Sequence, residues 1–126
     1  MGKVIAVDFD GTCVKHRYPS VGEDIGAAPI LKKLVNNGHK IILLTMRDNG
    51  KVLRDALKWF YDNDIPLYGI NLNPSQTWSD SRKVFANYYI DDQAIGCPVI
   101  YEDDGESYYV DWNALDKWFI DHGLYT

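Results

Sequence analysis

The 126-residue sequence has few cysteines and no apolar run long enough to cross a membrane. No apolar stretch approaches the roughly 18 residues that a membrane-spanning helix needs, and the first residues lack the pattern of a secretion signal. The two cysteines, Cys13 and Cys97, form no CxxC pair, so neither a disulfide framework nor a zinc site is indicated. The 13 basic and 18 acidic residues give a net charge of -5, which argues against general binding to nucleic acids or anionic membranes. We therefore expect a cytoplasmic protein without a membrane partner.

The pattern of apolar segments predicts a single α/β domain over residues 1–126. The chain is long enough for one hydrophobic core, and its 46% apolar and 25% charged residues are ordinary for a globular protein. The order of the segments predicts a doubly wound, mainly parallel sheet of about five strands with a short C-terminal hairpin. Strands are expected at residues 4–7, 41–45, 66–70 and 87–90, the hairpin at 97–112, and helices at 28–40, 48–64 and 112–122.

The stretch VIAVDFDGT, residues 4 to 12, combines a buried strand with two closely spaced acids. An apolar run that ends in Asp8, Asp10 and Gly11 is typical of a parallel strand opening into a loop, which is where ligands bind in open α/β sheets. Asp8 and Asp10 would repel each other unless a divalent cation, a shared proton or solvent separates them. An acidic turn with no further role is the alternative, since Asp and Gly also form turns.

Two other predicted strands end in polar residues in the same way. The run IILLT ends at Thr45, and the run NYYI is followed by Asp91 and Asp92. Because the carboxyl ends of parallel strands lie along one edge of a sheet, we expect these side chains to gather near Asp8. The acids of Asp103-Asp104-Gly105 are instead explained by a hairpin turn and are left out of the predicted site.

Converging acids, a hydroxyl and a nearby cation, here Lys83, are suited to phosphoryl transfer. Carboxylate oxygens are ligands that Mg²⁺ accepts, and a carboxylate can attack phosphorus to give an aspartyl-phosphate. A second acid two residues away can protonate the leaving oxygen and later activate water. Backbone amides at Gly11, the Thr45 hydroxyl and Lys83 could hold the phosphoryl oxygens, whose charge must be compensated.

The chain resembles the haloacid dehalogenase (HAD) superfamily of phosphohydrolases at four places in the right order. VIAVDFDGT is similar to the first motif, IILLT to the second, and KVFANYYIDD, with Lys83 eight positions before Asp91, to the third and fourth. The resemblance extends over residues 3 to about 95. It departs from the family at Cys13, where Leu is usual, and at Val84, where Pro often follows the lysine, so the adjacent Arg82 is an alternative to Lys83.

The resemblance implies a Mg²⁺-dependent phosphatase and a role for each matching residue. Asp8 would be the nucleophile and Asp10 the general acid/base, with Thr45 and Lys83 as the remaining catalytic residues. The implied metal ligands are Asp8, Asp10 through its main-chain carbonyl, Asp91 and Asp92. The implied phosphate- and substrate-binding residues are Gly11, Thr12, Thr45, Arg47 and Lys83.

The spacing of the motifs leaves no room for the cap domain that many members of this superfamily carry. An open site would suit a phosphorylated macromolecule or small molecule, or would be closed by a second subunit of a homo-oligomer. The loops 13–26 and 71–82 would then control specificity, with Arg17 and Trp78 as further candidates for substrate contact. The basic cluster Lys15-His16-Arg17 either attracts an anion or is simply solvated, and the alternative for Trp78, which we favour, is packing over the core edge.

Other functions remain open from the sequence. A receiver-type signalling domain also places acids, a threonine and a lysine on a doubly wound sheet, but with a different order of motifs. A phosphotransferase of the same superfamily, or a non-catalytic relative that binds phosphate or a partner, would carry the same motifs. The identity of the substrate is beyond what these residues indicate.

Overall fold

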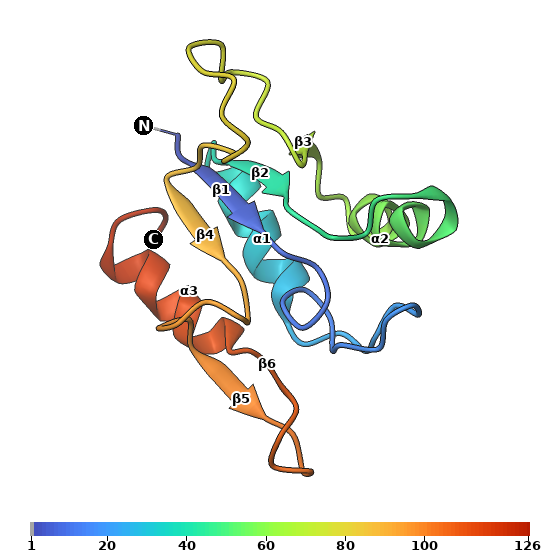
Figure 1. The fold of residues 1–126 in the computed structure, drawn as a ribbon. Coiled ribbons are helices and arrows are strands. Elements are labelled where there is room, and N and C mark those ends of the chain that lie inside the picture. Colours follow the sequence, from blue (N-terminus) through green and yellow to red (C-terminus); the bar gives the residue numbers. More distant parts are fainter. Residues whose placement is uncertain (1) are drawn as a thin grey trace.

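The computed structural model describes residues 2–126, so the first residue of the predicted domain 1–126 lies outside the described part. The chain forms an α/β fold (Figure 1). The strands are β1 (Val4–Val7), β2 (Lys40–Leu43), β3 (Leu67–Ile70), β4 (Tyr88–Ile90), β5 (Val99–Tyr101) and β6 (Tyr108–Val110). The helices are α1 (Ala27–Asn36), α2 (Gly50–Asp62) and α3 (Trp112–Asp121). All predicted helices and strands are present, with ends that differ by a few residues.

The main sheet is parallel and has four strands in the order β3-β2-β1-β4. The expected number of about five strands is wrong for this sheet, because β5 and β6 pair antiparallel with each other as a separate hairpin. The hairpin turn at Asp103-Asp104-Gly105 is confirmed. Asp104 accepts hydrogen bonds from the amides of Glu106 and Ser107.

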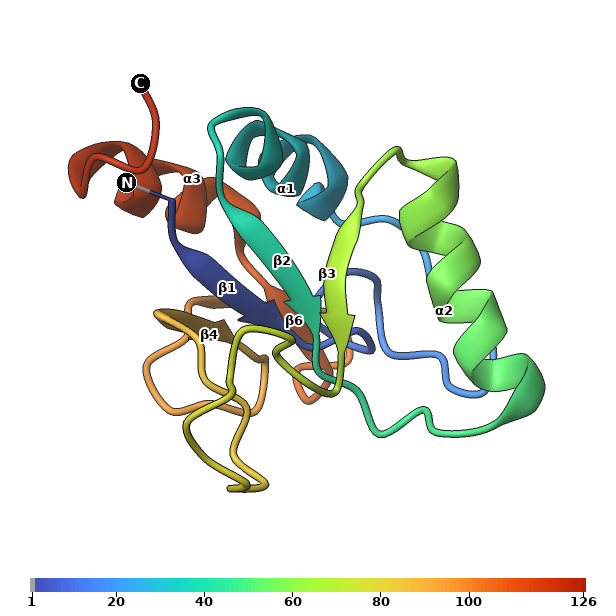
Figure 2. The same cartoon turned by 90° about the horizontal axis from the view of Figure 1, so that it is seen from above.

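The two faces of the sheet are covered differently. Alternate strand residues such as Ile5 and Leu43 belong to the large core, to which all three helices contribute. Residues of the opposite face, such as Ala6 and Ile42, pack against Ala86 of the β3–β4 connection in a much smaller cluster. Figure 2 shows α1 and α3 above the sheet and this connection below it. The strand order is therefore that of a doubly wound sheet, but an irregular segment rather than a helix covers the second face.

The strand order places β1 between β2 and β4. The connections after β1 and after β2 lead toward β3, whereas the chain after β3 returns to the other side of β1. Crevices at such a reversal of strand order are the usual ligand sites of open α/β sheets. The loops that follow β1 and β4 meet at this point.

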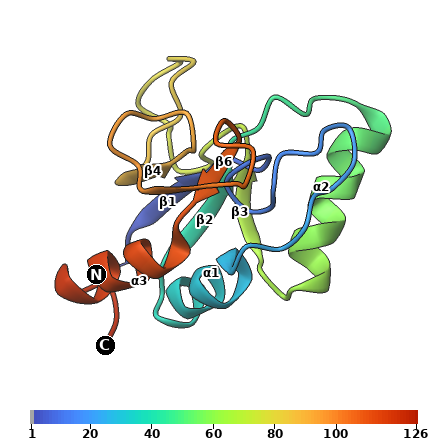
Figure 3. The ribbon, with the colours of Figure 1, turned by 90° about the horizontal axis from the view of Figure 1, so that it is seen from below.

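The segment between β1 and α1 is a long loop without regular secondary structure. It passes alongside α2 before α1 begins (Figure 3), and Trp59 of α2 donates a hydrogen bond of 2.8 Å from its indole nitrogen to Asp24. Two hydrogen bonds connect the hairpin and the start of α3 to the beginning of the same loop. The Val110 amide donates to the Gly11 carbonyl at 3.0 Å, and the Trp112 indole donates to the Thr12 carbonyl at 2.7 Å. Among residues 2–126, no helix combines the length and apolarity needed to span a membrane.

Candidate active site

A cleft of about 490 Å³ lies at the carboxyl ends of β1, β2 and β4. Its lining includes the predicted site residues Asp8, Asp10, Thr45, Arg47, Asp91 and Asp92. His16, Tyr18, Met46 and Gln93 complete it. A larger hollow of about 670 Å³ lies between β4 and α3, but its lining is mostly apolar and carries no acidic side chain. The convergence of strand ends predicted from the sequence is thus present in the structure.

Three carboxylates form the centre of the cleft. One oxygen from each of Asp8, Asp91 and Asp92 lies within 4.8 Å of the others. Within residues 2–126, none of these three acids is paired with a basic side chain. Asp92 is also only 7% exposed, so its charge is poorly solvated. Such a set of uncompensated oxygen donors matches the ligand preference of a hard divalent cation.

The protonation of Asp8 reflects this crowding. Burial and, next, the neighbouring Asp91 raise the pKa of Asp8 to about 8, although the Thr12 hydroxyl partly offsets the increase. Burial likewise raises the pKa of Asp91, and the charge of Asp92 adds to the effect. A cation between the carboxylates would reverse this tendency, because it stabilises their ionised forms.

The Thr12 hydroxyl contacts two of the three carboxylates, those of Asp8 and Asp92. Its hydroxyl oxygen lies 3.0 Å from Asp8 Oδ2 and 3.2 Å from Asp92 Oδ1, and it accepts a hydrogen bond from the Asp92 amide at 3.1 Å. The side chain is fully buried. Thr12 thus joins the loops that follow β1 and β4, and it presents no surface to a substrate.

Gly11 is required by the same close approach. Its φ is +81°, and a Cβ at this position would lie 2.4 Å from Asp92 Oδ2. Its amide donates to the Val14 carbonyl at 2.8 Å, and the Thr12 amide donates to the Phe9 carbonyl at 3.1 Å. The expected phosphate contacts of Gly11 and Thr12 stay a prediction; in this structure both amides donate within the loop that shapes the carboxylate cluster.

Asp10 lies in the cleft, but its side chain is outside the carboxylate cluster. Arg47 donates to both Asp10 oxygens, from Nε and Nη2, at 2.8 Å each. The guanidinium is 1% exposed, and its other hydrogens donate to the carbonyls of Pro19, Ser20 and Val52. All five N–H groups of Arg47 are thereby used. Arg47, predicted to contact substrate, has no donor left for one in this arrangement.

Thr45 occupies the predicted position at the end of β2. The residue lines the cleft, and its hydroxyl accepts a hydrogen bond from the Arg47 amide at 3.0 Å. Its own amide donates to the side chain of Asn71 at 2.8 Å. Asn71 follows β3 with a φ of +55°, and this supporting role was missed because the sequence offered only an asparagine in a loop.

Gln93 was also missed by sequence reasoning. Its side-chain nitrogen, Nε2, lies 3.2 Å from Asp92 Oδ2 and 3.3 Å from the Tyr108 hydroxyl of the hairpin. It directly follows the acidic pair, and that position was its only sequence signal.

The structure does not bring Lys83 to the cleft. The Lys83 ammonium lies 5.6 Å from the centre of the Tyr89 ring, and the residue is absent from the cleft lining. Trp78 is 66% exposed and packs edge-on against Phe85, also away from the cleft. Arg17 is paired with Glu102 rather than turned toward the carboxylates.

The fold and this cleft define an α/β protein with clustered carboxylates at the reversal point of a parallel sheet. The chain matches no family model and no curated protein. One solved structure similar to it is that of a conserved protein from Bacteroides thetaiotaomicron, with 34% identity and a TM-score of 0.77. The similarity covers 97% of this chain and 92% of that one. The chain belongs to the family of this conserved protein.

Proposed function

We propose that this chain is a Mg²⁺-dependent phosphate monoester hydrolase of the HAD type. The observation that carries the proposal is the meeting of Asp8, Asp91 and Asp92 oxygens within 4.8 Å at the ends of β1 and β4. The sequence motifs that resemble the HAD superfamily supply these same residues. Asp10 and Thr45 lie in the same cleft, as this chemistry requires.

The residues present fit a divalent cation. Three carboxylates without a basic partner carry charge that a cation would balance, and hard oxygen donors favour Mg²⁺. When bound, Mg²⁺ would neutralise charge on the transferring phosphoryl group. Asp8, Asp91 and Asp92 would hold it, together with the main-chain carbonyl of Asp10.

Asp8 is proposed to attack phosphorus, forming an aspartyl-phosphate as the bond to the leaving oxygen breaks. The Thr12 hydroxyl orients the nucleophile by its contact with Asp8 Oδ2. Asp10 would give a proton to the leaving oxygen and then take one from the water that hydrolyses the intermediate. Arg47 fixes the orientation of Asp10 by its two hydrogen bonds and favours the ionised carboxylate, the form that takes the proton from water. The Thr45 hydroxyl would contact a phosphoryl oxygen, and the presence of Thr45 in the cleft lining supports this role.

The test is the release of p-nitrophenol from p-nitrophenyl phosphate with Mg²⁺ or with a chelator, for the wild type, Asp8→Asn and Asp103→Asn. Asp103 lies in the hairpin turn outside the cleft and is the matched control. We expect Mg²⁺-dependent turnover that falls at least about 10³-fold in Asp8→Asn and is unchanged in Asp103→Asn.

Other outcomes would point to other functions. Transfer of the phosphoryl group to an added alcohol in preference to water would indicate a phosphotransferase. Mg²⁺ binding by calorimetry without turnover of any phosphate ester would indicate a non-catalytic binding protein. Neither binding nor turnover would contradict the proposal.

A further inference from the structure

The loop 13–26 supplies one wall of the cleft through His16 and Tyr18. Tyr18 is 53% exposed, and its ring centre lies 5.2 Å from the Arg47 guanidinium, which places an aromatic surface beside the buried Asp10–Arg47 pair. The loop has no regular secondary structure of its own. Contacts from other parts of the chain must therefore hold this wall in place.

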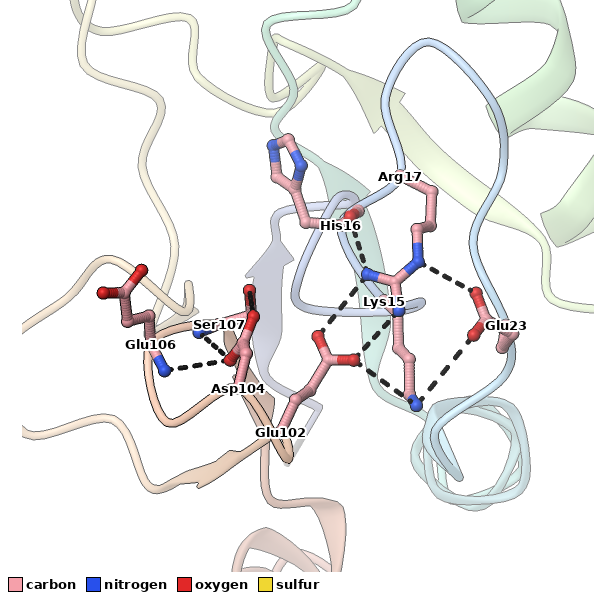
Figure 4. Close-up of polar contacts among 8 residues, drawn as sticks. All are labelled: Lys15, His16, Arg17, Glu23, Glu102, Asp104, Glu106 and Ser107. Atoms are coloured by element: carbon pink, nitrogen blue, oxygen red, sulfur yellow. Dashed lines mark hydrogen bonds and ion pairs between the residues drawn. The ribbon is translucent and has the colours of Figure 1, made fainter.

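Ion pairs to the hairpin provide such contacts on either side of His16. Arg17 Nη2 lies 2.9 Å from Glu102 Oε1, and Arg17 Nη1 lies 3.5 Å from Glu102 Oε2. Lys15 Nζ lies 3.6 Å from the same Oε1, and Glu23 lies near both cations. Figure 4 shows Glu102 on one side of the two basic side chains and Glu23 on the other, whereas the His16 ring points away from the ion pairs.

The hairpin holds Glu102 in position. The Glu102 side chain is 15% exposed, and the amide of this residue donates to the Ser107 carbonyl at 2.7 Å. Asp104 closes the turn by accepting from the Ser107 amide and hydroxyl. Because β6 is hydrogen-bonded to the Gly11 carbonyl, the carboxylate is fixed relative to the loop that carries Asp8 and Asp10.

Isolated surface ion pairs contribute little to stability, but this network differs from an isolated pair. Arg17 contacts both oxygens of one carboxylate, and a second cation shares that carboxylate. Bidentate geometry and shared partners are the conditions under which such pairs hold a conformation. The hydrogen bond from Arg17, together with its charge, lowers the pKa of Glu102.

We propose that Glu102 is a positioning residue that holds His16 and Tyr18 as the wall against which the leaving group of the phosphate ester rests. The inference depends on the proposed function and deepens it. A phenol ring and an imidazole beside the carboxylates favour esters whose leaving group is a flat aromatic ring, because such a ring can stack on Tyr18. A ligand that occupies only the phosphoryl position, such as inorganic phosphate, should bind with the same affinity whether or not this wall is held in place.

The experiment compares Glu102→Gln with Glu106→Gln. Glu106 lies in the same turn, but its side chain points away from loop 13–26 (Figure 4), so it controls for loss of one negative charge. For each variant, we would measure KM and kcat for p-nitrophenyl phosphate, the inhibition constant of inorganic phosphate, and hydrogen–deuterium exchange over residues 14–24.

Glu102→Gln is expected to speed exchange over residues 14–24 and to raise KM about threefold to fivefold, with kcat and the inhibition constant of phosphate unchanged. Glu106→Gln should behave as the wild type. An equal KM in Glu102→Gln and Glu106→Gln would overturn the proposed role of Glu102, and so would a parallel rise in the inhibition constant of phosphate. Either result would leave the proposed hydrolase function standing. A wild type without turnover of any phosphate ester would overturn the proposed function as well, so the two failures are distinct.

Discussion

Arg47 and Asp10 form a bidentate pair across 37 positions of sequence, with two hydrogen bonds of 2.8 Å. The arginine also donates to the carbonyls of Pro19, Ser20 and Val52, so the pair connects the acid to the cleft wall and to the start of α2. Asp10 in turn raises the pKa of Arg47 further above its usual value. These contacts are those of a residue that orients Asp10, and the prediction below tests this role.

Arg47→Lys should damage both stability and turnover. A lysine keeps the charge but cannot form the bidentate contact or donate to the three carbonyls, which would leave buried acceptors without partners. We expect a loss of about 2–4 kcal/mol in the free energy of unfolding, measured by urea denaturation, and a lower kcat. Arg82→Lys, at an exposed position, is the control. A variant as stable and active as this control would show that Arg47 has no positioning role.

Gly11→Ala should be more harmful than Gly105→Ala. Both glycines have positive φ, +81° and +72°, so both substitutions strain the backbone. Only the Cβ at position 11 would collide with Asp92, because nothing lies within 4 Å of the Cβ position at Gly105. We expect roughly 1 kcal/mol of destabilisation for Gly105→Ala, and a larger loss together with weakened Mg²⁺ binding for Gly11→Ala. Equal Mg²⁺ dissociation constants by calorimetry would contradict the close approach of Asp92.

The stability of the metal-free protein should fall as the pH rises. Because the pKa of Asp8 increases from 3.8 to about 8 on folding, the folded protein binds more protons than the unfolded chain between these values. The free energy of unfolding therefore decreases with pH across this window. In chelator, the wild type should lose more melting temperature between pH 5 and pH 8 than Asp8→Asn does. Parallel losses would mean that Asp8 ionises normally, and added Mg²⁺ should reduce the difference at pH 8.

Lys83→Ala tests the predicted catalytic role of Lys83, a residue that makes no contact in the cleft in this structure. The phosphoryl group needs charge compensation, and Arg47 has no spare donor. We therefore expect Lys83 to move from its position over Tyr89 when substrate binds, and Lys83→Ala to lower kcat/KM at least about tenfold. Arg82→Ala should have little effect. An unchanged kcat/KM in Lys83→Ala would assign it a role outside the reaction.

The sequence predicted most of the framework because its signals are local. Asp8, Thr45 and Asp91 directly follow or lie close to apolar strands, and parallel pairing brings such ends to one edge of the sheet. The start of α3 is fixed by a similarly local contact, because the Asp111 side chain accepts a hydrogen bond from the Ala114 amide at 3.1 Å.

The remaining features depend on contacts between distant parts of the chain. Thr12 lies 80 positions from Asp92, and Arg17 lies 85 positions from Glu102. Local patterns predicted Thr12 and Arg47 as binding residues, whereas in the structure both are buried and hydrogen-bonded to the acids, which a local pattern does not reveal. The number of strands was also overestimated, because periodicity does not reveal whether a strand joins the main sheet or pairs within a hairpin.

The most direct test of the proposed mechanism is to locate the phosphoryl group on the protein during turnover. The protein would be mixed with p-nitrophenyl phosphate and Mg²⁺, quenched in acid within milliseconds, digested and analysed by mass spectrometry. We predict a phosphorylated peptide whose modified residue is Asp8, and no such peptide from Asp8→Asn. Turnover with no phosphorylated peptide, or with the phosphoryl group on another residue, would contradict Asp8 as the nucleophile.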